Sequence, residues 1–287
     1  MRLGSIREIW RHPVKSMEGE RIAASAIESN GLPGDRAFAV RDEKRGGIRG
    51  AKKIPALMRC RARYLEEPKP GVPAPAPEIT LPDGARLRVD APDAAEQISA
   101  ALEHPVTLWP LRPAEDLAHY RRGAPDHADL VTELRAVFGR EADEPLPNIG
   151  AFPPDLLQYE SPPGTYFDAF PLLLVTDATL QRLAELAPGS RIDVRRFRPN
   201  LVVETGAGPG FVEAGWLGAR VRVGSALLEV TMACPRCVMI THGFADLPRD
   251  PGLMRTVVRE ADQCVGVYAS VREPGRVREG DGVERVS

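Results

Sequence analysis

Apolar and polar positions alternate with a period of two in several short runs of the first 110 residues, a pattern typical of β-strands. Pro82-Asp83-Gly84-Ala85 separates two of these runs and has the composition of a hairpin turn. A single helix is expected at 94–102. The expected strands are 5–11, 22–28, 36–41, 79–81, 86–89 and 106–109. Short strands at this close spacing predict a barrel or a curled sheet.

The middle of the chain changes to helical spacing. Residues 128–138 carry apolar side chains on one helical face and stop at Gly139, whereas 170–175 is a continuous apolar run typical of a buried strand. Thr176-Asp177 can cap a helix over 178–186. The β pattern then returns at 201–204, 221–223, 227–232 and 264–272. The proline-rich stretches 68–77 and 145–163 are expected to be extended loops.

Composition narrows the class of protein. The 287 residues are 43% hydrophobic and 27% charged, which predicts a globular chain with a sizeable core. A net charge of −2 argues against a nucleic-acid binder. The chain has no apolar run of 18 residues and no signal or transit peptide pattern, and its four cysteines are too few for a disulfide framework. We therefore expect a protein of a reducing, cytoplasmic setting without a membrane span.

Cys234-Pro235-Arg236-Cys237 places two thiols around an arginine at the end of an expected strand. A neighbouring guanidinium lowers the pKa of a thiol, and the thiolate is the form that binds soft metals. By itself the motif also fits a pair of buried structural cysteines, a thioredoxin-like dithiol, or part of a zinc site with His242 as a further ligand. Cys60 and Cys264 are expected to be core residues.

Four patches that are distant in sequence each place a basic residue at a turn or a strand end. They are Arg11-His12-Pro13-Val14-Lys15-Ser16, Gly34-Asp35-Arg36, Phe197-Arg198-Pro199-Asn200 and Cys234-Pro235-Arg236-Cys237. If their cations converge, they form a cradle for a phosphate or another polyanion. Taken singly, each of these side chains is more often a solvated charge or the partner of a carboxylate.

In these motifs the chain resembles the MOSC family, the molybdenum-cofactor sulfurase C-terminal domain proteins, whose two-part members include bacterial proteins and the mitochondrial amidoxime reducing component. The family's motifs appear here as Pro13-Val14-Lys15-Ser16, Gly31-Leu32-Pro33-Gly34-Asp35-Arg36, Phe197-Arg198-Pro199-Asn200, Cys234-Pro235-Arg236-Cys237 and the closing Pro274–Asp281. The resemblance implies a mainly β fold with α (α+β). Residues 1–110 would form an N-terminal MOSC β-barrel segment, and residues 111–287 a MOSC β-barrel domain with peripheral helices.

The resemblance also implies roles for individual residues. Cys237 would be the protein ligand of molybdenum and the catalytic residue, with Cys234 shaping the pocket beside it. The residues implied to bind the cofactor, Mo-molybdopterin, are Lys15, Ser16, Arg36, Thr176, Arg198, Asn200 and Arg236. A soft thiolate for the metal and several cations for the phosphate match the chemistry of this cofactor.

The implied activity is an oxidoreductase that removes the oxygen atom from N-hydroxylated small molecules, such as amidoximes and hydroxylamines, at molybdenum. The chain has no flavin, NAD or plant-type ferredoxin motif, so the expected electron donor is a separate flavin, haem or iron–sulfur protein. Two alternatives stay open. One is a molybdenum-cofactor carrier or sulfur-transfer protein that uses Cys237 as a ligand or persulfide; the other is a thiol–disulfide redox protein.

The basic run Lys44–Lys53 is expected to be a mobile, solvated loop. Two functional roles are weighed against that expectation: closing over the cofactor, or docking an acidic electron-transfer protein. Asp35 is expected to orient its turn, and His242 is a candidate for lining the substrate side of the pocket. His12, His104, His119 and His127 are expected to be structural or exposed.

Overall fold

Strands from both ends of the chain close a seven-stranded β-barrel in the computed structural model, which describes residues 1–286. Around the barrel the order is β1-β11-β10-β14-β13-β12-β16, and β16 pairs with β1 again. Their bounds are β1 Arg2–Arg11, β10 Leu172–Thr176, β11 Leu201–Glu204, β12 Arg220–Val223, β13 Ala226–Pro235, β14 Cys264–Glu273 and β16 Gly282–Val286. The expected α+β class with a barrel is confirmed.

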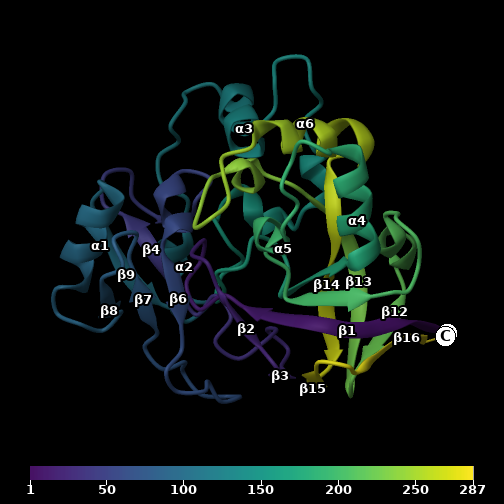
Figure 1. The fold of residues 1–287 in the computed structure, drawn as a ribbon. Helices are drawn as coiled ribbons and strands as arrows, with labels where there is room; N and C mark the ends of the chain where they lie inside the picture. Colours follow the sequence, from purple (N-terminus) through teal and green to yellow (C-terminus); the bar gives the residue numbers. More distant parts are fainter. Residues whose placement is uncertain (287) are drawn as a thin grey trace.

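The strand β1 closes the barrel by pairing antiparallel with β11 and β16, in the registers Ile9↔Leu201 and Ser5↔Gly282. Ile6 and Ile9 are both buried in the barrel core although they are three residues apart, because the strand register shifts between Ile6 and Glu8. In Figure 1, β1 is the purple strand that runs across the barrel. The expected boundary near residue 110 stays a prediction, but the first strand of the N-terminal part belongs to the barrel formed with the C-terminal part.

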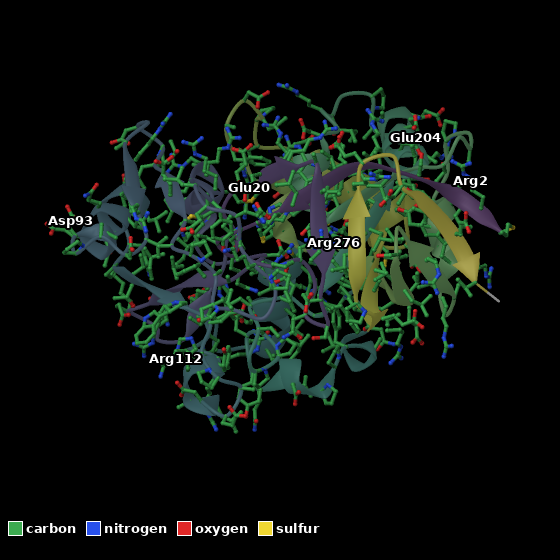
Figure 2. The ribbon with its side chains drawn as sticks, turned by 90° about the horizontal axis from the view of Figure 1, so that it is seen from below. Arg2, Glu20, Asp93, Arg112, Glu204 and Arg276 are labelled. Atoms are coloured by element: carbon green, nitrogen blue, oxygen red, sulfur yellow. The ribbon has the colours of Figure 1, made fainter. Side chains whose placement is uncertain are left out.

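The remaining strands of the N-terminal part form smaller sheets beside the barrel. Two three-stranded sheets have the orders β5-β4-β9 and β6-β7-β8, while β2 extends the barrel sheet next to β1 and β3 pairs with β15. The bounds are β2 Glu20–Ile22, β3 Ala24–Ile27, β4 Phe38–Asp42, β5 Ile48–Arg49, β6 Arg61–Arg63, β7 Glu78–Thr80, β8 Arg86–Arg88, β9 Val106–Pro110 and β15 Gly275–Arg278. Figure 2 labels Asp93 in this part, on the opposite side of the molecule from Arg2 and Glu204 of the barrel.

Within the described residues, six α-helices lie around these sheets: α1 Ala94–Leu102, α2 Leu117–Tyr120, α3 Leu130–Phe138, α4 Asp177–Leu186, α5 Val194–Phe197 and α6 Pro251–Glu260. Gly139 ends α3 in the left-handed conformation, and the Thr176 hydroxyl caps α4 by accepting from the Thr179 amide. Short 3-10 segments are η1 Pro55–Arg59, η2 Ile149–Ala151, η3 Pro154–Leu157, η4 Val212–Trp216 and η5 Val238–Thr241. None of the helices in residues 1–286 is both long enough and apolar enough to cross a membrane.

The expected strands and helices are found with small shifts of their ends, and the closing segment 274–281 contains β15. The sequence analysis missed the short elements α2, α5, β2, β5 and β6, and also α6 and β16. The helix α6 has Asp250 as its N-cap and a proline in its first turn, so its start signal was present in the sequence. In β16, polar residues interrupt the alternation, and its assignment depends on pairing with β1 and β12.

Candidate functional site

The two cysteines of Cys234-Pro235-Arg236-Cys237 have different surroundings. Cys234 lies near the end of β13 and is 1% exposed within the core that α6 and β14 cover. Cys237 follows the strand as the N-cap of η5 and is half-buried, and it packs against the core of the N-terminal part. Cys237 is therefore the thiol of this pair with more access to a ligand.

Arg236 binds the buried cysteine. Its Nη1 donates to Cys234 Sγ at 2.9 Å, and its Nη2 donates to the Phe197 carbonyl oxygen at 2.8 Å. Burial raises the pKa of the Cys234 thiol, and the guanidinium only partly offsets this effect. The expectation that the arginine favours a thiolate is therefore wrong for Cys234, because desolvation outweighs the nearby charge.

Lys15 turns inward from the segment that follows β1. Its Nζ donates to the Tyr166 carbonyl oxygen at 2.8 Å, to Ser161 Oγ at 3.2 Å and to Asp168 Oδ1 at 3.1 Å. Burial lowers the pKa of Lys15, and the carboxylate of Asp168 partly restores it. The lysine thus connects the N-terminal part to the segment that enters β10.

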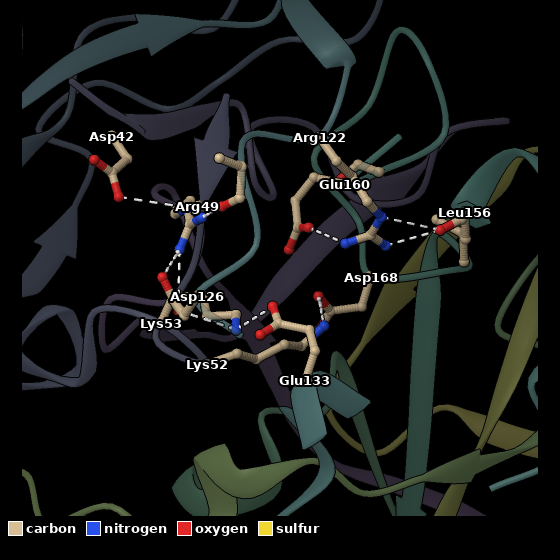
Figure 3. Close-up of polar contacts among 12 residues, drawn as sticks. Asp42, Arg49, Lys52, Lys53, Arg122, Asp126, Glu133, Leu156, Glu160 and Asp168 are labelled. Carbon is tan, nitrogen blue, oxygen red and sulfur yellow. Dashed lines mark hydrogen bonds and ion pairs between the residues drawn. The ribbon is translucent and has the colours of Figure 1, made fainter. Parts of the chain in front are cut away.

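Asp168 is the carboxylate on which several cations meet. Its Oδ1 lies 3.1 Å from Nζ of both Lys15 and Lys52 (Figure 3 shows the Lys52 contact). Burial would raise the pKa of Asp168, but the charges of Lys15, Lys52 and Arg36 outweigh it and hold the pKa well below its ordinary value. The side chain is nevertheless 42% exposed, so an anion from solvent can reach this group of charges.

Three of the expected cofactor residues have a left-handed backbone. The φ angles of Ser16, Arg36 and Arg198 are +70°, +49° and +54°. Residues other than glycine adopt this conformation at a cost, and such strain concentrates at functional sites. Tertiary contacts hold it here: for example, Ser16 Oγ accepts from the Ala51 amide at 2.9 Å.

Arg36 and Arg198 lie against each other. Arg36 Nη1 forms an ion pair with Asp35, and its Nη2 donates to the Arg198 carbonyl oxygen at 3.4 Å. Arg198 Nη1 donates to the Met17 carbonyl oxygen at 2.5 Å. Burial and the neighbouring charge of Arg36 lower the pKa of Arg198. An anion bound here would relieve the repulsion between the two guanidinium groups.

The structure thus brings the expected cations together. The charges of Arg36, Asp168 and Arg236 all act on Arg198, and the Cys237 thiol lies close enough to interact with Lys52 and Arg236. Four segments that are distant in sequence meet in one place, as a polyanion cradle requires. The individual cofactor-binding roles stay predictions.

Asn200 and Thr176 have other partners. Asn200 Oδ1 accepts from the Leu173 amide at 3.2 Å, and its Nδ2 donates to the Trp10 carbonyl oxygen at 3.3 Å, so this side chain connects β10 with β1. Thr176 Oγ1 donates to the buried Glu213 carboxyl group at 2.7 Å. Both side chains are occupied by structural contacts, and neither forms a hydrogen bond with the four cations in the part of the chain described.

The expectation of a mobile, solvated loop at Lys44–Lys53 is wrong for its second half. Arg49 is 7% exposed and donates to Asp126, and Lys53 pairs with both Asp126 and Glu133 (Figure 3). These carboxylates come from the central segment, where the sequence analysis looked for no partner. Internal ion pairs therefore hold these cations and leave them less available for docking an acidic protein.

Lys52 and Asp168 are the site residues that sequence reasoning missed. Lys52 was considered only within a basic run, and Asp168 was not considered at all. The sequence contained one usable signal, a lone acidic residue in the apolar stretch Tyr166–Val175. A charge in such a stretch needs a partner.

The zinc alternative finds no support in residues 1–286, which contain no cluster of three or more His, Cys, Asp or Glu side chains able to hold a metal. His242 instead lies with its Nε2 3.0 Å from the Ala51 carbonyl oxygen. Burial lowers the pKa of His242. This histidine connects the segment after η5 with the segment that carries Lys52.

With this geometry in view, comparison with known families defines the class of the protein. Residues 3–113 match the MOSC N-terminal beta barrel domain, and residues 163–284 match the MOSC domain. The chain belongs to the MOSC-domain family, in its two-part form. Residues 114–162, between the two matches, include the central segment that carries Asp126 and Glu133.

The chain is also similar to individual proteins of known sequence or structure. The chain is 31% identical to human mitochondrial amidoxime reducing component 2 over 134 residues, which span 42% of this chain and 38% of that protein. It is 23% identical to mouse mitochondrial amidoxime-reducing component 1 over 310 aligned residues, which span 98% of this chain and 82% of that protein. The crystal structure of the YUAD protein from Bacillus subtilis covers 98% of this chain and 93% of its own, with a TM-score of 0.43 and 12% identity.

Proposed function

We propose that this chain binds a molybdenum cofactor and reduces N-hydroxylated small molecules with electrons from a separate electron-transfer protein. Membership of the MOSC family and similarity to proteins named for amidoxime reduction support this proposal. The observation that carries it is the group of cations around Asp168 beside Cys237. Lys15 and Lys52 contact the Asp168 carboxylate at 3.1 Å, and Arg36 and Arg198 lie near enough to interact with its charge.

The residues present fit an anionic, sulfur-bound cofactor. Positive charge exceeds negative charge around Asp168, and the buried Nε of Arg236 has no hydrogen-bond partner within residues 1–286. Gly50 lets its backbone approach Ser16 closely, because a Cβ there would lie only 2.6 Å from Ser16 Oγ and 3.6 Å from Lys15 Cε. A buried donor without a partner, surrounded by an excess of positive charge, suits a phosphate group.

Each group of residues has a distinct role in this proposal. Cys237 would hold the metal through its thiolate, because a half-buried thiol at a strand end can be reached by the cofactor. Lys15 and Arg198 would bind the phosphate, and the Asp35 carboxylate keeps the Arg36 guanidinium in place. When bound, the molybdenum centre would supply the two-electron chemistry that removes oxygen from an N–OH group.

The overall reaction consumes two electrons and two protons and converts the N–OH group into N–H and water. Lys52 Nζ, which pairs with Asp168 and lies near Cys237, keeps its positive charge because these neighbours raise its pKa. Lys52 would therefore stabilise negative charge at the reacting end of the site rather than release a proton. The partly exposed Asp168 carboxylate would accept a hydrogen bond from an N–H group of an amidine product.

The proposal is tested on protein that carries the cofactor, by measuring its molybdenum content and its catalytic turnover. The chain is produced in cells with an active cofactor pathway, and its molybdenum content and pterin fluorescence are measured. Reduction of benzamidoxime with a chemical electron donor should then depend on Cys237. Retention of full metal content by Cys237→Ala would contradict the proposed ligand, and cofactor binding without turnover of any N-hydroxylated compound would favour the carrier alternative.

A further inference from the structure

A small, partly enclosed cavity lies next to the cation cluster, on the side of the N-terminal part. Its volume is about 10 Å³, and His12, Glu18, Gly19, Met58 and Arg198 are among the residues that line it. This volume is close to the minimum that one water molecule needs. The cavity is too small for a cofactor or for any organic substrate.

Two buried polar atoms on the residues of this cavity have no hydrogen-bond partner within residues 1–286. They are Nδ1 of His12, which is 3% exposed, and Nη2 of Arg198, which is 8% exposed. Buried polar atoms are nearly always paired with protein or with ordered water. Both residues line the cavity, so an occupant would be their shared partner.

The chemistry of the two atoms identifies that occupant. His12 Nε2 lies 3.3 Å from the Pro199 carbonyl oxygen, which can only accept, so Nε2 carries the proton and Nδ1 presents a lone pair. Arg198 Nη2 can only donate. The occupant must therefore donate to one atom and accept from the other. A simple anion cannot donate, and a cation would be repelled by the guanidinium.

His12 stays neutral in this position. Burial lowers the pKa of His12 well below its ordinary value, and the charges of Arg198 and Arg36 lower it further. Gly19 shapes the same place, since a Cβ there would lie 2.5 Å from His12 Nδ1. A neutral imidazole with a free lone pair and no neighbouring side chain at residue 19 suits a small polar molecule.

We propose that this cavity holds one ordered water molecule, which donates to His12 Nδ1 and accepts from Arg198 Nη2, and that His12 is thereby a positioning residue for the Arg198 guanidinium. The positioning role rests on the proposed function, whereas the water site does not. When Nη1 donates to the Met17 carbonyl oxygen and Nη2 donates to the water, two hydrogen bonds fix the orientation of the guanidinium plane. Its remaining N–H groups are then oriented before an anion arrives.

The water itself is tested by a crystal structure of the full chain at a resolution that shows ordered solvent. The expected result is one peak within hydrogen-bond distance of both His12 Nδ1 and Arg198 Nη2. An empty cavity, or a peak that only one of the two atoms can reach, overturns the proposal. This measurement needs no variant and does not depend on the cofactor.

Two matched substitutions test the positioning role. His12→Asn keeps an acceptor near the place of Nδ1, whereas His12→Gln keeps a donor near the place of Nε2 and loses the acceptor. Binding of inorganic phosphate, measured by calorimetry, should weaken about tenfold in His12→Gln, which corresponds to ~1.4 kcal/mol or one hydrogen bond. In His12→Asn it should stay within about twofold of the parent protein, given that the acceptor is kept.

Equal losses of phosphate affinity in the two variants would overturn the positioning role, because a purely structural histidine predicts no difference between them. Thermal melting of both variants shows whether they fold. If His12→Gln does not fold, His12→Asn is tested alone. The water peak should then still be present in the crystal structure of His12→Asn. A protein that shows the water but takes up neither phosphate nor molybdenum would contradict the proposed function and leave the water site intact.

Discussion

Arg236 Nη1 lies 2.9 Å from the sulfur of Cys234, two residues before it in the same motif. The guanidinium therefore belongs to the buried cysteine, and its Nη2 is held by the Phe197 carbonyl oxygen. Cys237, one residue after the arginine, is left half-buried at the start of η5. The two thiols of one short motif thus have separate tasks: Cys234 orients the arginine, and Cys237 is free to take a ligand.

This division predicts opposite outcomes for the two cysteines. Cys237→Ser should lower the molybdenum content of the purified protein by at least about tenfold, because the soft ligand is lost. Cys234→Ser should keep most of the metal but lower the melting temperature, since it changes a buried contact of Arg236. Elemental analysis and thermal melting distinguish the two effects, and equal metal loss in both variants would contradict the division.

The same division predicts which thiol reacts with an alkylating reagent. Burial raises the pKa of Cys60 to about 11 and that of Cys264 to about 12, and it raises that of Cys234 as well. Thiols with raised pKa values are poor nucleophiles near neutral pH. Mass spectrometry of the metal-free chain after brief iodoacetamide treatment should find the label on Cys237 first, and a first label on Cys60 would count against this prediction.

Asp168→Asn should strengthen the binding of inorganic phosphate and destabilise the ligand-free chain. The substitution removes the anion that now neutralises Lys15 and Lys52, so an incoming phosphate no longer meets a like charge. We expect about tenfold tighter phosphate binding, equal to ~1.4 kcal/mol of removed repulsion. Calorimetry measures the affinity, and thermal melting measures the stability.

The matched control for that experiment is Asp126→Asn. Asp126 also pairs with cations of the basic run, Arg49 and Lys53, but its charge is not among those that act on Arg198. This variant should lose stability without a change in phosphate affinity. Equal tightening in both variants would show that general charge, and not the position of Asp168, controls the binding.

The buried carboxyl group of Glu213 makes the stability of the folded protein depend on pH. Burial raises the pKa of Glu213 above its ordinary value, although the Thr179 and Thr176 hydroxyls counteract this, and its Oε1 has no partner among residues 1–286. Because the folded pKa is the higher one, this carboxyl group favours folding most below its unfolded pKa of 4.5, and the contribution is lost as the pH rises through the folded pKa.

Glu213→Gln removes this titration. The melting temperature of the variant should match that of the parent chain near pH 4 and exceed it by about 2–4 °C near pH 7.5, the size expected for ~1 kcal/mol in a large domain. Glu204→Gln, at an exposed position of β11, is the control and should change little at either pH. A difference that does not vary with pH would rule out titration of Glu213 as its cause.

Barrel closure by β1 predicts the behaviour of fragments. A fragment of residues 111–287 lacks β1, so β11 and β16 would have unpaired edges, and we expect it to aggregate. A circular permutant that joins the two chain ends by a short linker and opens at the exposed residues 142–143 should fold. Met1 lies beside Arg285, because its amino group donates to the Arg285 carbonyl oxygen at 2.9 Å.

Circular dichroism and size-exclusion chromatography compare the fragment with the permutant. A monomeric, cooperatively folding fragment would show that β1 is dispensable for the barrel. In that case the expected boundary near residue 110 would also be a true folding boundary.

The elements that could be predicted from the sequence are those with local causes. Helix α1 was expected at the residues it occupies, and α3 ends at Gly139, because helical periodicity and a glycine C-cap act within a few residues. The hairpin of β7 and β8 depends equally on its own turn. The helix α6 was missed although its N-cap Asp250 and the proline in its first turn are local start signals.

The site residues also differ in whether local sequence identifies them. The motifs around Lys15, Arg36, Arg198 and Cys237 were recognised from short stretches, since each needs a particular side chain at a turn or strand end. Their shared partner Asp168 was not recognised. A single carboxylate between apolar residues carries no sign of which distant cations will meet it.

The amino-acid sequence by itself determined the local elements, the family motifs and the kinds of side chain available for an anionic, metal-bearing ligand. Only the tertiary structure decided that β1 closes the barrel and that Lys52 and Lys15 share Asp168. The physical reason is range. Helix caps and turns are decided by neighbouring residues, whereas strand closure and charge pairing depend on contacts between segments more than 100 residues apart, which no local pattern encodes.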